Sequence, residues 1–143
     1  MTATTKEAMV EADKIAKGII ASIEEFMDNV PVSTAESAVK FWLCTGPNPV
    51  SGTKAAPREA VNAANDLARL LHPTELNNLI QKNGIEYEYE VMYQIYDHFY
   101  GKGHDDITPG HRKGCVFGGG FMLDLFEAKA TGKEIKNIKR TWR

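Results

Sequence analysis

The most constraining feature of this sequence is an apolar seam within its first 30 residues. Apolar side chains recur there at steps of three and four for three full heptads, which is the spacing of one helix face. They are Met9, Ala12, Ala16, Ile19, Ile23, Phe26 and Val30. Ile15, Ile20 and Met27 widen the seam into a face too broad for a two-stranded coiled coil. A helix from Thr5 to Val30 would be about 39 Å long, so we expect it to be the rod of a bundle or to pack on a second chain.

The composition is that of a compact globular protein and excludes several other classes. The 143 residues are 43% hydrophobic and 25% charged, unlike a disordered or fibrous chain. No apolar run approaches the roughly 18 residues of a membrane helix. Cys44 and Cys115 are too few for a secreted disulfide framework, and the N-terminus lacks a signal-peptide pattern. We therefore expect one cytoplasmic domain over residues 1–143, with no membrane-embedded part.

Prolines, glycines and a capping pattern divide the chain into further helices. Pro31 ends the first helix, because the residue before a proline avoids helical geometry. Ser33 and Glu36 have the spacing of a capping box, which predicts a second helix that folds back along the first as an antiparallel hairpin. The remaining expected helices are a third from Pro57 to Leu71, a fourth from Thr74 to Asn83 and a last one that begins at Phe121 and is interrupted at Gly132.

Residues 85–100 carry two competing periodicities. Three glutamates alternate with Ile85, Tyr87, Tyr89 and Val91, which is the period of a half-buried strand. A second spacing of four and three residues runs further along the chain and favours a helix. It comprises Ile85, Tyr89, Met92, Tyr96 and Phe99. Because no partner strand is evident elsewhere, the sequence predicts an all-α fold, an irregular helical bundle of about five to seven helices around the long N-terminal helix.

The charges are unevenly distributed along the chain. Residues 129–143 hold six lysine or arginine side chains and one glutamate, whereas residues 1–128 hold 11 basic and 18 acidic side chains. A basic C-terminal tail is typical of a solvated helix end, where cations complement the helix dipole. The alternative is nucleic-acid binding through this tail.

The glycine-rich stretch 97–120 contains residue types that bind metals and anions. The candidate metal ligands are His98, His104, Asp105 and His111. The candidate anion-binding residues, at an expected helix N-terminus, are Arg112, Lys113, Gly118, Gly119 and Gly120. Their spacing matches no known metal, phosphate or nucleophile motif, so a polar surface loop is the simpler interpretation. We predict no catalytic residue and no cofactor.

The apolar seam of the N-terminal helix and a cluster of tyrosines indicate a surface that contacts another protein molecule. The interface candidates are Met9, Ile19, Ile23, Phe26, Tyr89, Tyr93 and Tyr96. We therefore expect a protein-binding or assembly module, a homo-oligomer that occludes or scaffolds a macromolecular partner. The alternatives are a metal- or anion-binding enzyme that uses residues 97–120, and nucleic-acid binding through the C-terminal tail.

Overall fold

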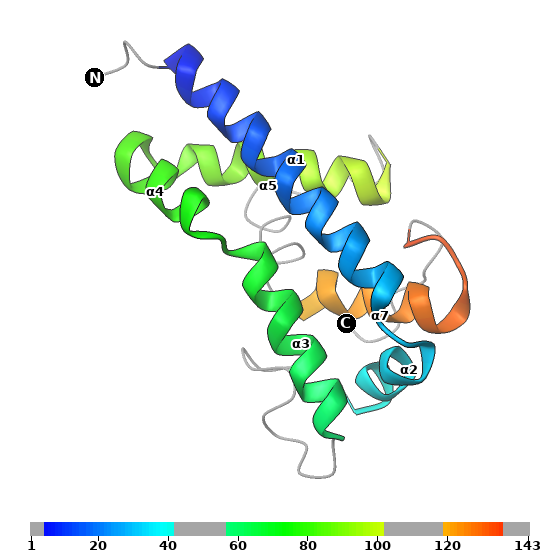
Figure 1. The fold of residues 1–143 in the computed structure, drawn as a ribbon. Helices are drawn as coiled ribbons and strands as arrows, with labels where there is room; N and C mark the ends of the chain where they lie inside the picture. The colour runs from blue at the N-terminus through cyan, green and yellow to red at the C-terminus, as the bar shows by residue number, and fades with distance from the viewer. Residues whose placement is uncertain (1–4, 42–56, 102–118, 136–143) are drawn as a thin grey trace.

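The protein is built from helices in the part of the chain that the structure describes. The computed structural model describes residues 5–41, 57–101 and 119–135. Helices make up 89% of these residues and no strand occurs among them, which confirms the all-α prediction. The helices are α1 (Thr5–Asn29), α2 (Val32–Phe41), α3 (Arg58–Leu71), α4 (Thr74–Asn83), α5 (Glu86–Tyr100) and α7 (Gly119–Thr131) (Figure 1).

Helix α1 lies against most of the other helices. It runs diagonally across the view in Figure 1, with α5 crossing behind it, and it also contacts α3, α4 and α7. Its buried side chains are Ala8, Ala12, Ile15, Ala16, Ile19 and Ile23. The apolar face of α1 is therefore covered by helices of the same chain, and the length of this helix does not by itself require a second chain.

The buried face of α1 begins at a different residue from the predicted seam. Ala8 is 3% exposed, whereas Met9 is 38% exposed and Val10 is 65% exposed. A straight helix has 3.6 residues per turn, so a strict seven-residue repeat drifts slowly around its surface. A heptad seam that matches the buried face in the middle of α1 therefore departs from that face near the N-terminus. Met9 consequently lies at the surface.

Helix α2 departs from the expected hairpin. It packs against α7 and α3 rather than back along α1, and its buried side chains Thr34, Ala35 and Ala38 are small enough to let a neighbouring helix approach closely. The expected capping box is also wrong, because the helix begins at Val32 and Ser33 lies within its first turn. The backbone N–H of Ala35 instead donates to the carbonyl oxygen of Pro31 at 3.0 Å.

Two glycines end helices where the sequence predicts. Gly84 follows α4 with a φ of 117°, and Gly132 follows α7 with a φ of 75°. Side chains disfavour this left-handed region, so glycine allows the chain to leave each helix without strain. The N–H of Gly84 donates to the carbonyl oxygen of Ile80, and that of Gly132 donates to the carbonyl oxygen of Ala128.

The structure also resolves the two periodicities of residues 85–100 in favour of a helix. The buried side chains of α5 are Tyr87, Val91, Met92, Ile95, Tyr96 and Tyr100, which share one helical face. Ile85 precedes the helix and is 54% exposed. The alternating glutamates therefore lie in the first turns of a helix, where negative charge is favourable near the dipole's positive end.

Candidate functional site

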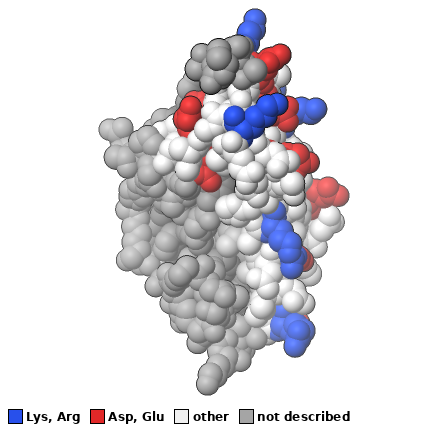
Figure 2. Space-filling model, turned by 90° about the vertical axis from the view of Figure 1, so that its left-hand side faces the viewer, with Lys and Arg blue, Asp and Glu red and all other residues white. Residues whose placement is uncertain are grey.

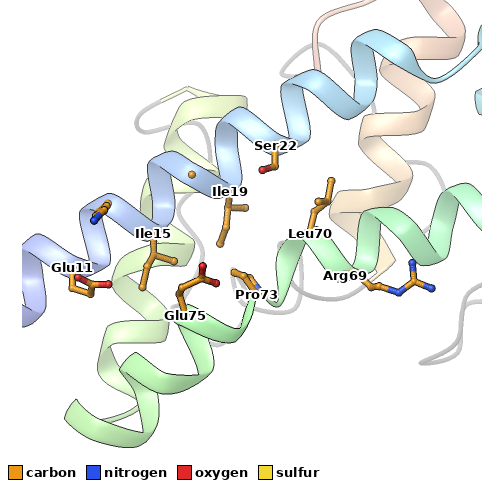
Figure 3. A pocket seen from close by; sticks show the side chains of 10 residues that line it. Glu11, Ile15, Ile19, Ser22, Arg69, Leu70, Pro73 and Glu75 are labelled. Carbon is orange, nitrogen blue, oxygen red and sulfur yellow. The ribbon is translucent and has the colours of Figure 1, made fainter.

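A groove lies between α1 and the α3–α4 pair. It has a volume of about 390 Å³, within the range of sites that hold small molecules or side chains of a partner. Its apolar floor is formed by Ile15 and Ile19 of α1 together with Leu70 and Pro73 from the region where α3 gives way to α4. Figure 3 shows these four side chains in the space between the two walls.

Gly18 and Ser22 line the α1 wall of the groove. Gly18 is exposed, and a Cβ added there would meet no atom within 4 Å among the described residues, apart from the adjoining backbone of α1. A glycine inside a helix is less favourable than alanine by about 1 kcal/mol. No contact of Gly18 among the described residues offsets that cost. The space beside Gly18 on the groove wall is therefore left unfilled by the described residues.

Charged side chains of both signs border the floor. Arg69 stands at one end, where its Nη1 lies 2.6 Å from Oδ1 of Asp66 in an exposed ion pair. Glu11 of α1 and Glu75 from the first turn of α4 stand toward the other end, on opposite walls (Figure 3). Lys14 also lines the groove from α1. The groove is therefore lined by two carboxylates, by Lys14 and by the guanidinium of Arg69, which Asp66 partly neutralises.

The groove continues into a second hollow of about 320 Å³. The two share Glu11 and Glu75, and Glu7 and Lys82 extend the charged border. Three carboxylates and one lysine therefore surround this second hollow. Acidic and basic side chains are otherwise interspersed on the described part of the face in Figure 2, where neither sign forms a large separate area.

The chemistry of the groove is suited to binding. Among its described lining residues there is one hydroxyl, that of Ser22, and there is no histidine or cysteine that could act as its base or as a nucleophile. An apolar floor with a few polar groups at its border is the usual composition of a recognition surface.

The predicted interface residues divide into two groups. Ile23 and Tyr96 are fully buried, so they pack against other helices of this chain. Ile19 is 3% exposed and lines the floor of the groove, and the assignment of these three as contact residues stays a prediction. The remaining members have at least part of their side chain at the surface: Met9 is exposed, and Phe26, Tyr89 and Tyr93 are half-buried.

The predicted metal ligands are represented by a single described residue. His98 lies near the end of α5, and its Nε2 is 2.8 Å from a carboxylate oxygen of Glu24 on α1. It therefore contacts a neighbouring helix, and no group of three or more potential metal ligands occurs within the described residues. His104, Asp105 and His111 lie outside these residues, so the metal site remains a prediction.

The predicted anion site and the basic tail are likewise only partly described. Gly119 and Gly120 are the first two residues of α7, two positions ahead of the predicted helix start at Phe121. Arg112, Lys113 and Gly118 lie outside the described residues, as do residues 136–143 of the tail. Anion binding and nucleic-acid binding therefore stay predictions.

A buried polar contact between α5 and α7 escaped the sequence analysis. Asp124 is fully buried, and the hydroxyl of Tyr100 donates a hydrogen bond to its Oδ2. Burial is the main factor that raises the pKa of nearby Glu127; the negative charge of Asp124 raises it further, and Lys133 partly opposes the effect. The available signal was an aspartate inside the apolar run from Phe121 to Phe126.

Comparisons of the chain with models of known protein families, with curated proteins and with solved structures gave no match. None of the helices in the described ranges combines the length and apolar character that crossing a membrane requires. The function is therefore argued from the groove itself.

Proposed function

We propose that this chain is a small cytoplasmic protein-binding or assembly module and that the groove between α1 and α3–α4 is its contact surface. The observation that carries the proposal is the combination of an apolar floor with an open wall. Ile15, Ile19, Leu70 and Pro73 supply the floor, and Gly18 leaves the wall unobstructed. Apolar side chains of a partner would lose water on this floor, and the release of water from apolar surface is the main driving force of association.

The charged border supports a macromolecular partner over a small metabolite. The groove and the second hollow adjoin each other at Glu11 and Glu75, which line both. Polar groups at the rim of an apolar centre set the register and choice of a protein partner. A module of this kind acts by occluding or scaffolding the molecule that it binds.

Site-specific photo-crosslinking in the native host tests this proposal. A photoreactive amino acid at Ser22, on the groove wall, is expected to crosslink to a protein, and the same amino acid at exposed Glu36 on α2 serves as the control. The crosslinked protein, once identified by mass spectrometry and purified, should compete with formation of the Ser22 product. Equal products from both positions, or none from Ser22, would contradict a role for the groove.

A measurement of solution mass tests the assembly form of the proposal. In the assembly form of the proposal copies of the chain associate, so light scattering on the purified chain is expected to give a multiple of its 15.9 kDa mass. A monomer that still crosslinks at Ser22 leaves the binding of a different protein as the function, whereas a monomer with no crosslink contradicts both forms.

A further inference from the structure

We infer that the occupant of the groove is an amphipathic α-helix of another protein, with an apolar stripe on one face and lysine or arginine at one end. This inference rests on the proposed function and specifies the partner. The basic end of the helix would lie over Glu7, Glu11 and Glu75, and its apolar stripe would lie on the floor between α1 and α3–α4.

The shape of the groove favours a helix. Ile15 and Ile19 are one turn apart on α1, so they form a ridge along one side of the floor, and Leu70 and Pro73 form its other side. A helix that enters such a slot packs its own row of side chains between the two ridges. Gly18 lies beside this path with free space above it, and a residue without a side chain lets a second backbone come close. The otherwise unfavourable glycine is explained by such an approach.

The charge of the groove favours a basic end on that helix. Glu7, Glu11 and Glu75 border the second hollow, and Lys82 is the single lysine or arginine among its described lining residues. A cation placed there gains several carboxylate neighbours, whereas an anion meets repulsion. At the other end of the groove, Arg69 is already paired with Asp66, so it attracts or repels a charged side chain of the partner less strongly.

The same charges disfavour a second copy of the described helices as the occupant. These regions contain 17 aspartate or glutamate residues and nine lysine or arginine residues. The excess of acidic side chains in these regions of both copies opposes their direct contact, although the full chain, with 17 basic and 19 acidic side chains, has a net charge of only −2. A separate basic helix satisfies the carboxylates without this repulsion.

Two synthetic helical peptides provide the test. Both are about 15 residues long with leucines at helical i, i+3, i+4 and i+7 spacing; one ends in three lysines and the other in three glutamates. Fluorescence anisotropy with labelled peptides and the full chain is expected to show at least tenfold tighter binding of the lysine peptide. Rising salt concentration should reduce this difference, because exposed charges are screened.

Matched variants locate the binding on the protein. Gly18→Leu should weaken binding of the lysine peptide at least tenfold, whereas Ala21→Leu adds the same side chain at another exposed position of α1 and should have no effect. The Glu11→Lys/Glu75→Lys variant should reverse the preference between the peptides. Glu25→Lys, an exposed charge change on α1 outside the groove, should leave the preference unchanged. Circular dichroism confirms that each variant is folded.

Several results would overturn the inference. Equal binding of both peptides, or binding that Gly18→Leu and Glu11→Lys/Glu75→Lys leave unchanged, contradicts the proposed occupant. If neither peptide binds but Ser22 still crosslinks to a protein, the helix inference fails while the proposed function stands. A dimer that Gly18→Leu converts to a monomer identifies a second copy as the occupant. Removal of residues 136–143 that tightens peptide binding tenfold identifies the chain's own tail instead.

Discussion

The hydrogen bond between Tyr100 and Asp124 makes a quantitative prediction about stability. Tyr100→Phe removes the hydroxyl donor but keeps the ring, which stacks on Tyr96 with centroids 4.5 Å apart and also contacts Phe121. The change therefore isolates the polar contact from the packing. A hydrogen bond to a charged group contributes about 1.5–3 kcal/mol, and Asp124 has a further interaction besides this bond. We expect a loss of about 2 kcal/mol in the free energy of unfolding.

Thermal and urea denaturation measure this loss. For a chain of this size, 2 kcal/mol corresponds to a decrease of roughly 4–8 °C in Tm. Tyr87→Phe is the matched control, because Tyr87 is also buried in α5 and its hydroxyl has no hydrogen bond among the described residues. A double-mutant cycle with Asp124→Leu should show that the two losses are not additive. A Tyr100→Phe variant within about 0.5 kcal/mol of the wild type, or full additivity in the cycle, would refute the reasoning.

Two further predictions concern charge and packing. The pKa of Glu127 is raised above its ordinary value of 4.5, so the folded state binds a proton at this carboxyl more tightly than the unfolded state does. The folded state therefore loses stability as the pH rises from 4.5 through the higher pKa of the folded protein. Glu127→Gln should therefore be more stable than the wild type at pH 7 and should lose this advantage below pH 4.5 in urea titrations, with Glu36→Gln as an exposed control; an advantage that persists at pH 3.5 would contradict the assignment. Ile23→Ala empties a fully buried site in α1 and should cost about 2–5 kcal/mol while Ser22 crosslinking is retained in the folded fraction; a neutral result in urea denaturation would mean that α1 is not packed as described.

The burial of Ile23 also affects how assembly should be tested. Aspartate at Ile19 or Ile23 would place a charge in the core of this chain, and an unpaired buried charge destabilises the fold itself. Loss of assembly in such variants would then report unfolding rather than a broken interface. Exposed Gly18 avoids this ambiguity, because its substitution changes the groove and leaves the core side chains in place.

Much of the helical organisation follows from local signals. The apolar spacing of α1 and the glycines after α4 and α7 act within a few residues, so a reader of the sequence recovers the helix boundaries closely. The start of α2 is an exception, because the backbone bond between Ala35 and Pro31 takes the place of the side-chain cap expected from Ser33. Where two ways of starting a helix have similar energies, the tertiary contacts around the helix select between them.

The candidate site was less accessible to sequence analysis. Gly18 is a glycine in the middle of an amphipathic helix, but its openness depends on how far α3 and α4 stand from α1. The groove joins residues 11–22 to residues 69–75, and no periodicity links such distant segments. Likewise, the aspartate in the apolar run of α7 gave no indication that Tyr100 would be its partner.

The sequence by itself determined that this chain is helical and where most of the described helices begin and end, because those properties depend on side-chain period, proline and glycine within one or two turns. Only the tertiary structure decided that α2 packs on α7, that Ile19 and Ile23 belong to the core, and that a groove remains open beside Gly18. These outcomes depend on which apolar faces cover one another across long stretches of chain, and many arrangements of the same helices bury similar amounts of surface. The choice among them depends on the fit of particular side chains in three dimensions.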